Sequence, residues 1–365
     1  MILGDIKSKL RKTDWVLWGA VLLLTAIGLT AIYSVSLGSD PIDYSSFKKQ
    51  IVIFVFALLI ALVVSFLNYS IFRMYSRYLY WGSVLLLLGV LFFGVTINGT
   101  TGWFNVFGFN FQPVELAKLA LVLFLAKFFS NRYQQFNEAR HIIVSFVGTM
   151  ILTFLVLMQP DAGSALVLLG LWFLLLTVSG VKWRYIITLV LILSVATLFL
   201  WGFVFQDYQK ERVHNFINPQ LDPLGSGYNV TQAIIAVGSG GLWGRGLGFG
   251  SQSQLKFIPE SQTDFIFAVI AEELGLLGVT LVLSLWFVIF YRLLKAAKQA
   301  PDDFGMYLLL GIAVVFLIHL IVNIGMNIGV LPVTGISLPF LSSGGSFLMT
   351  SVFMIGMAQS VIIRR

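Results

Sequence analysis

The sequence predicts an all-α polytopic integral membrane protein with about ten transmembrane helices. Hydrophobic residues make up 58% of the chain and charged residues only 11%, whereas a soluble domain has roughly 25% charged residues. Apolar runs of about 18 residues or more recur along the chain, and each is long enough to cross roughly 30 Å of hydrocarbon. Basic residues gather at alternate breaks between these runs, as they do at the cytoplasmic ends of membrane helices. We therefore treat residues 1–365 as a single transmembrane domain.

The apolar runs define ten expected spans, taken from one polar break to the next. They are 15–35, 50–67, 78–95, 113–130, 141–158, 164–180, 185–203, 265–291, 305–325 and 344–362. Four basic residues precede the first run, and no small-residue cleavage signal follows it, so it is expected to be a span and not a removable signal peptide. The chain has no cysteine, which excludes disulfides and thiolate metal sites.

The basic residues predict the orientation of the spans. An even number of spans puts both termini on one side, and that side holds 16 of the 23 lysines and arginines, against six on the opposite side and Lys118 within a span. The positive-inside rule then makes both termini cytoplasmic. The positive charge is thus explained by topology, and nucleic acid is not an expected partner. No cytoplasmic loop is large enough to bind ATP.

Residues 204–263 form one long outward-facing loop between spans seven and eight. Tyr228–Val237 is an apolar stretch too short to cross the bilayer, but it suits a re-entrant or interfacial helix. Glycines alternate from Gly244 to Gly250, as in some nucleotide-binding loops. No strand precedes them and no Gly-Lys pair follows, which favours close backbone turns. Arg245 and Lys256 lie beside these glycines and could still meet a phosphate.

Asp264 ends this loop and directly precedes the eighth span, so we expect it at the membrane interface near the depth of lipid phosphates. Two interpretations stay open. The carboxylate could cap the helix N-terminus, with Thr263 beside it. It could also act as a general base, because partial desolvation raises the pKa of a carboxylate towards a useful value.

Further ionisable residues lie within or near the spans. Glu115 and Lys118 are three residues apart near the outer end of the fourth span, where they could form either a functional pair or a structural ion pair. For Glu272 and Glu273, a structural role between helices is favoured over a catalytic one. Asp161 lies in a short outer loop, where an aspartate commonly forms a turn.

The three histidines of the chain are scattered. Their positions, 141, 214 and 319, show no metal-ligand spacing, so no site is assigned to them.

Five segments, in order, resemble the SEDS family (shape, elongation, division and sporulation), which includes RodA and FtsW. They are GWFNVFGFNFQPVELAKLAL (102–121), QPDAGSAL (159–166), ERVHNFINPQLDPLGSGYNVTQAIIAVGSGG (211–241), FIPESQTDFIFAVIAEELGLLG (257–278) and GVLPVTGISLPFLSSGGS (329–346). The resemblance covers essentially the whole chain. The short ends and the first of these segments look more like the RodA branch than the FtsW branch.

The resemblance implies a peptidoglycan glycosyltransferase that polymerises lipid II at the outer face of the bacterial cytoplasmic membrane during cell elongation. It also implies a class B penicillin-binding protein, a transpeptidase, as partner. The family's key aspartate matches Asp264, and the charged pair of its QPxELAK motif matches Glu115 and Lys118. The remaining matched positions are Asp161, Arg212 and Trp103.

The reaction implied by the resemblance inverts the configuration of the transferred sugar, which calls for one base and a stabilised leaving group. Asp264 is the expected base, with Glu260 close by in a supporting role. The departing pyrophosphate is expected to meet Arg212, Arg245, Lys256 or a divalent cation, although no dedicated metal site is predicted. Two rival functions stay open, a lipid II flippase and a scaffold for the transpeptidase.

Overall fold

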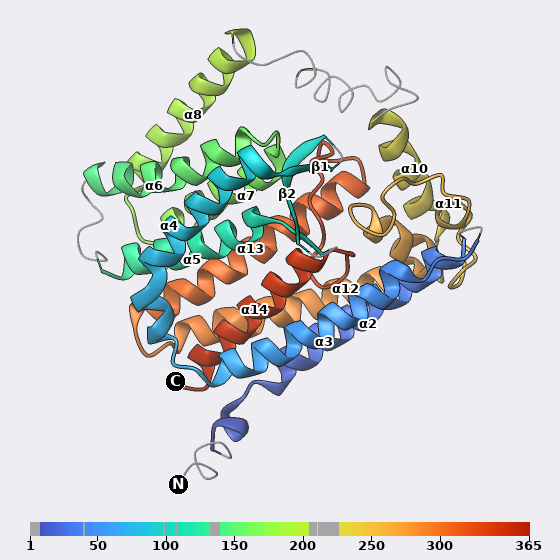
Figure 1. Ribbon diagram of the computed structural model, residues 1–365, viewed down its shortest axis with the longest axis horizontal. Helices are drawn as coiled ribbons and strands as arrows, with labels where there is room; N and C mark the ends of the chain where they lie inside the picture. Colours follow the sequence, from blue (N-terminus) through green and yellow to red (C-terminus); the bar gives the residue numbers. More distant parts are fainter. Residues whose placement is uncertain are drawn as a thin grey trace.

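The computed structural model describes residues 8–38, 41–97, 99–106, 109–131, 139–203, 210 and 226–365. Ten helices correspond to the ten expected spans (Figure 1). They are α2 (Trp15–Leu37), α3 (Ser45–Phe66), α4 (Ser70–Phe93), α5 (Pro113–Ser130), α6 (Ala139–Leu157), α7 (Ala162–Val178), α8 (Trp183–Phe203), α12 (Ile266–Lys298), α13 (Asp303–Asn327) and α14 (Gly345–Ile362). Seven of them, all except α5, α7 and α8, are long and apolar enough by themselves to cross a membrane. The expected fold class is thereby confirmed.

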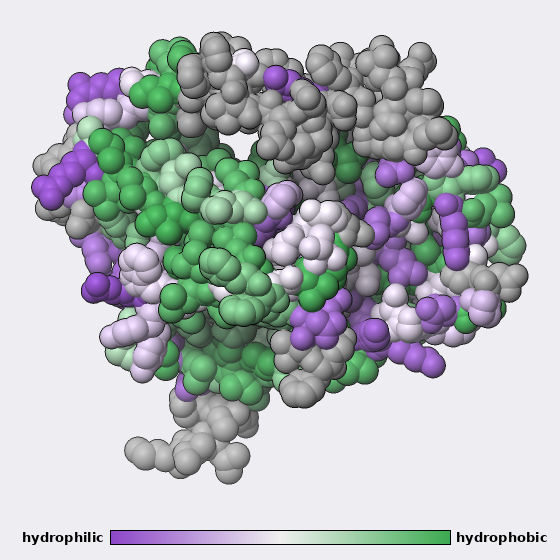
Figure 2. Space-filling view, turned by 45° about the horizontal axis from the view of Figure 1, so that its top comes forward, coloured by the Kyte–Doolittle hydropathy of each residue, from purple (hydrophilic) through white to green (hydrophobic). Residues whose placement is uncertain are grey.

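The outside of the helix bundle is apolar. Large side chains such as Phe92, Phe93 and Phe287 are 79%, 80% and 70% exposed. Figure 2 shows hydrophobic side chains over the middle of one face and hydrophilic ones towards its edges. Burying one such side chain away from water contributes about 1.5–3 kcal/mol, so these surfaces are stable only when lipid covers them.

Helices α13 and α14 are the most buried of the spanning helices, and α5 packs against both. The start of α2 and the end of α14 lie at one end of the bundle (Figure 1). There Arg292 forms an ion pair with Asp14 at 2.6 Å, and the Gln359 side chain bonds to the Asp14 backbone. Loop segments and the short helices α10 (Ser226–Ser239) and α11 (Ser251–Gln254) lie towards the other end. Helix α10 includes the apolar stretch for which a short helix was expected.

A small antiparallel sheet between α4 and α5 was not expected from the sequence. Its strands are β1 (Val95–Ile97), β2 (Thr100–Val106) and β3 (Phe109–Phe111), in the order β1-β2-β3. The strands alternate polar and aromatic residues, as in Phe104 opposite Phe111 and Asn105 opposite Asn110. Strand β3 packs on α14 and β2 on α4 and α5, so the sheet covers the end of the bundle opposite the chain termini.

Helix α12 is broken at Gly275, whose φ of 62° and ψ of −162° interrupt the helical backbone. The glycine loop (residues 240–250) fills this break. Backbone N–H groups of residues 245 and 246 donate to the carbonyls of 272 and 273, and those of 276 and 277 donate to the carbonyls of 241 and 242, all within 2.9–3.2 Å. A Cβ atom on Gly244 would clash with the carbonyl oxygen of Glu273. The glycines therefore permit a close backbone approach, as the turn interpretation expected.

The carboxylates of Glu272 and Glu273 reinforce this junction. Glu272 accepts hydrogen bonds from the N–H groups of Gln252 and Ser253 at 2.8 and 3.0 Å. Glu273 accepts one from the Ser34 hydroxyl at 2.5 Å. Both glutamates are almost fully buried, and their partners are structural, in agreement with the role the sequence favoured.

Candidate active site

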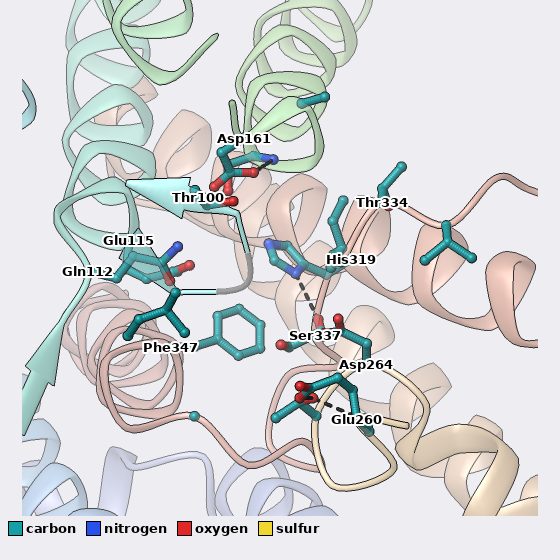
Figure 3. A pocket seen from close by; sticks show the side chains of 18 of the residues that line it. Thr100, Gln112, Glu115, Asp161, Glu260, Asp264, His319, Thr334, Ser337 and Phe347 are labelled. Carbon is teal, nitrogen blue, oxygen red and sulfur yellow. Dashed lines mark hydrogen bonds between the residues drawn. The ribbon is translucent and has the colours of Figure 1, made fainter. Parts of the chain in front are cut away.

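A cavity of about 480 Å³ opens at the end of the bundle that carries the sheet and the glycine loop. It is lined by residues of β1, β2, α5, α10, α13, the starts of α7 and α14, the segment before α12 and the segment joining α13 to α14. The ionisable side chains in its lining are Glu115, Lys118, Asp161, Glu260, Asp264 and His319. Figure 3 shows the carboxylates around the cavity, with His319 between them.

The backbone at Asp264 is held from α13. Asn323 and Asn327, one helical turn apart, both donate side-chain hydrogen bonds to the carbonyl oxygen of Asp264, at 2.9 and 3.0 Å. Asn323 also donates to the carbonyl of Ile336 at 2.7 Å. The amide oxygen of Asn327 accepts the N–H of Ala268 in the first turn of α12 at 3.1 Å. Asn327 thus satisfies a backbone donor that a capping side chain would normally take.

The segment between α13 and α14 holds the same backbone from another side. The hydroxyl of Ser342 donates to the carbonyl of Thr263 at 2.6 Å, and the N–H of Ser343 donates to the carbonyl of Gln262 at 2.8 Å. Residues 262–264 are therefore fixed by two separate elements. Such double support suits a side chain that must be placed precisely.

The helix-cap interpretation of Asp264 is wrong. The N-cap residue of α12 is Phe265, and its side chain makes no capping hydrogen bond. The Asp264 carboxyl lines the cavity and accepts a hydrogen bond from Ser337. The carboxyl therefore faces the cavity and does not cap the helix.

The surroundings raise the pKa of Asp264 to about 6 from an ordinary value of 3.8. Desolvation by burial is the main cause, and the negative charges of Glu260 and Asp161 add to it, while the Ser337 hydrogen bond opposes it. A carboxylate with this pKa is mostly ionised at neutral pH and binds a proton more readily than an ordinary aspartate. This is the behaviour required of a general base.

Glu115 and Lys118 form a buried ion pair at the wall of the cavity. The Lys118 ammonium donates to Glu115 Oε1 at 2.8 Å, and both side chains are less than a tenth exposed. Lys118 Nζ also lies 3.3 Å from His319 Nε2 and 5.4 Å from the centre of the Phe347 ring. The pair is therefore part of the cavity and not an isolated contact between helices.

Asp161 and Trp103 also line the cavity. Asp161 is the N-cap of α7, where its Oδ1 accepts the N–H of Ser164 at 2.9 Å. The turn-forming role expected of Asp161 is therefore realised as a helix cap, and the same carboxylate still faces the site (Figure 3). Trp103 belongs to β2 and places an aromatic ring at the cavity wall.

The loop residues expected at the site do not all line the cavity. Glu260 lines the cavity and accepts a hydrogen bond from the Thr263 hydroxyl at 2.9 Å. Arg245 bonds to the carbonyl of Ser239 at 3.0 Å, and neither Arg245 nor Lys256 is among the described residues that line the cavity. Arg212 lies outside the described residues.

Four polar residues at or next to the cavity were not predicted from the sequence as part of the site. They are His319, Asn323, Asn327 and Ser337. The first three occupy one face of α13 at intervals of four residues. A signal was available, because polar side chains repeated every fourth residue within an otherwise apolar span mark a face turned towards a polar interior.

Comparison with known proteins identifies relatives over the whole length of the chain. A profile of the family described as "Cell cycle protein" (FtsW/RodA/SpoVE) matches residues 14–364. Peptidoglycan glycosyltransferase MrdB of Escherichia coli K12 is 36% identical over 323 residues, which cover 88% of this chain and 87% of that protein. Stage V sporulation protein E of Bacillus subtilis is 38% identical, with coverage of 97% and 98%.

Solved structures agree. The rod shape determining protein RodA of Thermus thermophilus superposes with a TM-score of 0.71 at 30% identity, covering 96% of each chain. A chain from a peptidoglycan synthase complex, described for its coordination of polymerization and crosslinking, superposes with a TM-score of 0.82 at 32% identity, covering 96% of this chain and 97% of that one. The resemblance noted from the motifs is therefore confirmed, and this chain belongs to the FtsW/RodA/SpoVE family of cell cycle proteins.

Proposed function

We propose that this protein is a peptidoglycan glycosyltransferase that polymerises lipid II with Asp264 as its general base. One observation carries the assignment of the base. The Asp264 carboxyl lies in the cavity with a pKa raised to about 6, while side chains of α13 hold its backbone and supply the helix cap. The names of the relatives, peptidoglycan glycosyltransferase MrdB among them, support the reaction class.

The chemistry follows from the linkages of the substrate. The sugar of lipid II is α-linked to pyrophosphate and the polymer is β-linked, so a single displacement inverts the anomeric carbon. The 4-hydroxyl of the acceptor attacks that carbon and gives its proton to the Asp264 carboxylate. The bond between the carbon and the pyrophosphate oxygen breaks, and the lipid-linked pyrophosphate departs with the electron pair.

We assign the stabilisation of the leaving group chiefly to Lys118. Of the described residues that line the cavity, it is the one lysine or arginine. An ammonium placed within a partly desolvated wall attracts a pyrophosphate more strongly than an exposed ammonium does. The sequence also suggested Arg245 and Lys256 for this role. Neither residue lines the described part of the cavity, so we assign the role to Lys118.

A divalent cation would need ligands from both the protein and the substrate. Among the described residues, no group of three or more histidines and carboxylates could hold a metal ion. Asp161, Glu260 and Asp264 nevertheless bring carboxylates to one cavity, and Mg²⁺ commonly binds one or two carboxylates together with substrate phosphates. When bound in this way, the cation would add positive charge next to the leaving pyrophosphate.

We place the cavity at the outer face of the cytoplasmic membrane and both termini in the cytoplasm. The excess of basic residues on the side of the termini supports this orientation, and the cavity lies at the opposite end of the bundle. Lipid anchors on donor and acceptor then confine both substrates to one plane, which reduces the entropic cost of their encounter. A neighbouring structure comes from a peptidoglycan synthase complex, and we propose a class B penicillin-binding protein as partner.

The test compares the wild-type protein with Asp264→Asn and with Asp43→Asn, a matched change of an exposed loop carboxylate outside the cavity. The proteins are purified with the transpeptidase partner, reconstituted in vesicles and supplied with labelled lipid II. We expect glycan ladders from the wild type and Asp43→Asn and none from Asp264→Asn. Wild-type-like ladders from folded Asp264→Asn would refute the assignment of the base. Transfer of lipid II across the vesicle membrane without lengthening would favour a flippase, and neither activity would favour a scaffold.

A further inference from the structure

His319 is a buried imidazole at the wall of the cavity for which the mechanism above has no use. It lies on α13, one turn from Asn323, and is 2% exposed. Its ring stacks on Phe347, with the ring centres 4.8 Å apart and the planes 26° apart. Figure 3 shows His319 between Asp161 on one side and Ser337 and Asp264 on the other.

The hydrogen-bond partners of His319 define its tautomer. Nδ1 lies 3.0 Å from the carbonyl oxygen of Ser337, and a carbonyl can only accept, so Nδ1 carries the proton. Nε2 lies 3.3 Å from Nζ of Lys118, and an ammonium can only donate. Nε2 therefore offers its lone pair, and the ring is neutral.

The neutral ring fixes the direction of Lys118. A lysine ammonium sits on a flexible four-carbon stem, so two acceptors are needed to define where it points. Glu115 Oε1 at 2.8 Å is one acceptor, and His319 Nε2 is the other. Of the three N–H groups of the ammonium, two are then directed at protein, and the third can meet an oxygen in the cavity.

The neutrality of the second acceptor matters for anion binding. Glu115 already balances the charge of Lys118, and a second carboxylate beside the ammonium would make the cluster net negative and repel an anionic ligand. A neutral imidazole orients the ammonium without adding negative charge.

We propose that His319 is a positioning residue that holds the Lys118 ammonium in place for the diphosphate of a lipid-linked donor. The inference rests on the proposed function, because it takes the donor of the glycosyl transfer as the ligand. His319 acts through Lys118 and does not itself contact the reacting atoms.

The experiment is a double-mutant cycle on the full-length protein with its transpeptidase partner. The variants are His319→Leu, Lys118→Met, the double variant, and His319→Gln, whose amide can both donate to a carbonyl and accept from an ammonium. His141→Leu is the matched control, since it removes another buried histidine, on α6, that does not line the cavity. Polymerisation rates are measured against lipid II concentration, and binding of undecaprenyl diphosphate is measured separately.

We expect His319→Leu to raise KM for lipid II and the Kd for undecaprenyl diphosphate by about tenfold. His319→Gln should restore most of this loss, His141→Leu should leave KM unchanged, and the double variant should be no worse than Lys118→Met alone. The inference is overturned if the losses of the two single variants multiply, if His319→Gln is as poor as His319→Leu, or if His319→Leu binds the diphosphate normally.

These outcomes separate the inference from the proposed function. A wild-type protein that fails to lengthen lipid II contradicts the proposed function, whereas normal lengthening by both the wild type and His319→Leu contradicts the positioning role alone. If His319 had only a structural role, His319→Leu would lower the thermal unfolding temperature, and its loss of activity would add to that of Lys118→Met in the double variant. Should His319→Leu fail to fold, His319→Phe takes its place, because it keeps an aromatic ring against Phe347 but offers no acceptor to Lys118. A positioning role predicts a raised KM for His319→Phe and a near-normal KM for His319→Gln, and equal KM values for these two variants would overturn it.

Discussion

The raised pKa of Asp264 predicts how polymerisation depends on pH. A base with a pKa of about 6 is about 90% ionised at pH 7 and about 10% ionised at pH 5. The rate at low substrate concentration should therefore fall about tenfold between these values, with the inflection near pH 6. An ordinary aspartate with a pKa of 3.8 would lose little activity over this range.

Two substitutions should move the inflection in opposite directions. Glu260→Gln removes a negative charge that raises the pKa of Asp264, so the inflection should shift to lower pH. Ser337→Ala removes a hydrogen bond that lowers it, so the inflection should shift to higher pH. A nearby exposed charge contributes about 0.2–1 kcal/mol, and one pH unit corresponds to about 1.4 kcal/mol, so the inflection of Glu260→Gln should shift by about 0.1–0.7 pH units.

The assay is the initial rate of lipid II polymerisation from pH 4.5 to 8 at constant ionic strength, for the wild type, the two variants and Asp43→Asn. The last of these changes a carboxylate outside the cavity and should keep the wild-type profile. An inflection that stays in place in both variants, or that moves the same way in both, would refute the assignment of the acid limb to Asp264.

Three further predictions concern stability and are checked by thermal unfolding in detergent together with polymerisation. Asp264→Asn should unfold at a higher temperature than the wild type at pH 7. The pKa of Asp264 is higher in the folded protein than its unfolded value of 3.8, so the ionised carboxylate destabilises the fold as the pH rises above 3.8, by up to about 3 kcal/mol above pH 6 before solvent screening. A lower unfolding temperature for Asp264→Asn would contradict this. Asn327→Ala should cost about 1–3 kcal/mol and reduce polymerisation, because it removes the hydrogen bonds of this side chain to the N–H of Ala268 and to the carbonyl of Asp264. Wild-type activity and stability would show that these hydrogen bonds are dispensable. Gly244→Ala should destabilise the protein strongly because of the clash with the α12 backbone, whereas Gly238→Ala, with open space around it, should be neutral or slightly stabilising; equal effects would disprove the close approach.

Apolar length was sufficient to predict the spans. Each of the ten expected runs became a helix, because lipid-exposed backbone must satisfy its hydrogen bonds internally. The sheet at residues 95–111 was missed because its strands of three to seven residues carry only a weak alternating pattern beside long apolar runs. The break in α12 was missed because a single glycine after Glu272 and Glu273 does not by itself end a long apolar helix, and only the approach of the glycine loop shows why the helix is interrupted there.

The site was predicted only in part, because some of its contacts join residues far apart in the sequence. The motifs selected the carboxylates and Lys118, and the cavity brings these residues together. The interpretation of Asp264 stayed open because the residue that replaces it at the helix N-terminus, Asn327, is 63 positions further along the chain. The role expected of Arg245 stays a prediction, since its Nε donates to the carbonyl of Ser239 within the loop and the residue does not line the described part of the cavity. Such contacts depend on tertiary packing, which neighbours in the sequence do not reveal.

The break at Gly275 has a mechanical consequence. The segment of α12 that follows Asp264 is joined to the membrane part of that helix through hydrogen bonds supplied by the glycine loop. A continuous helix would need those carbonyls and N–H groups for itself, so α12 can straighten only if the loop leaves. The docked loop and the break at Gly275 therefore require each other. The break lies 11 residues after Asp264, so the docked loop also fixes the direction in which the first turns of α12 leave the site.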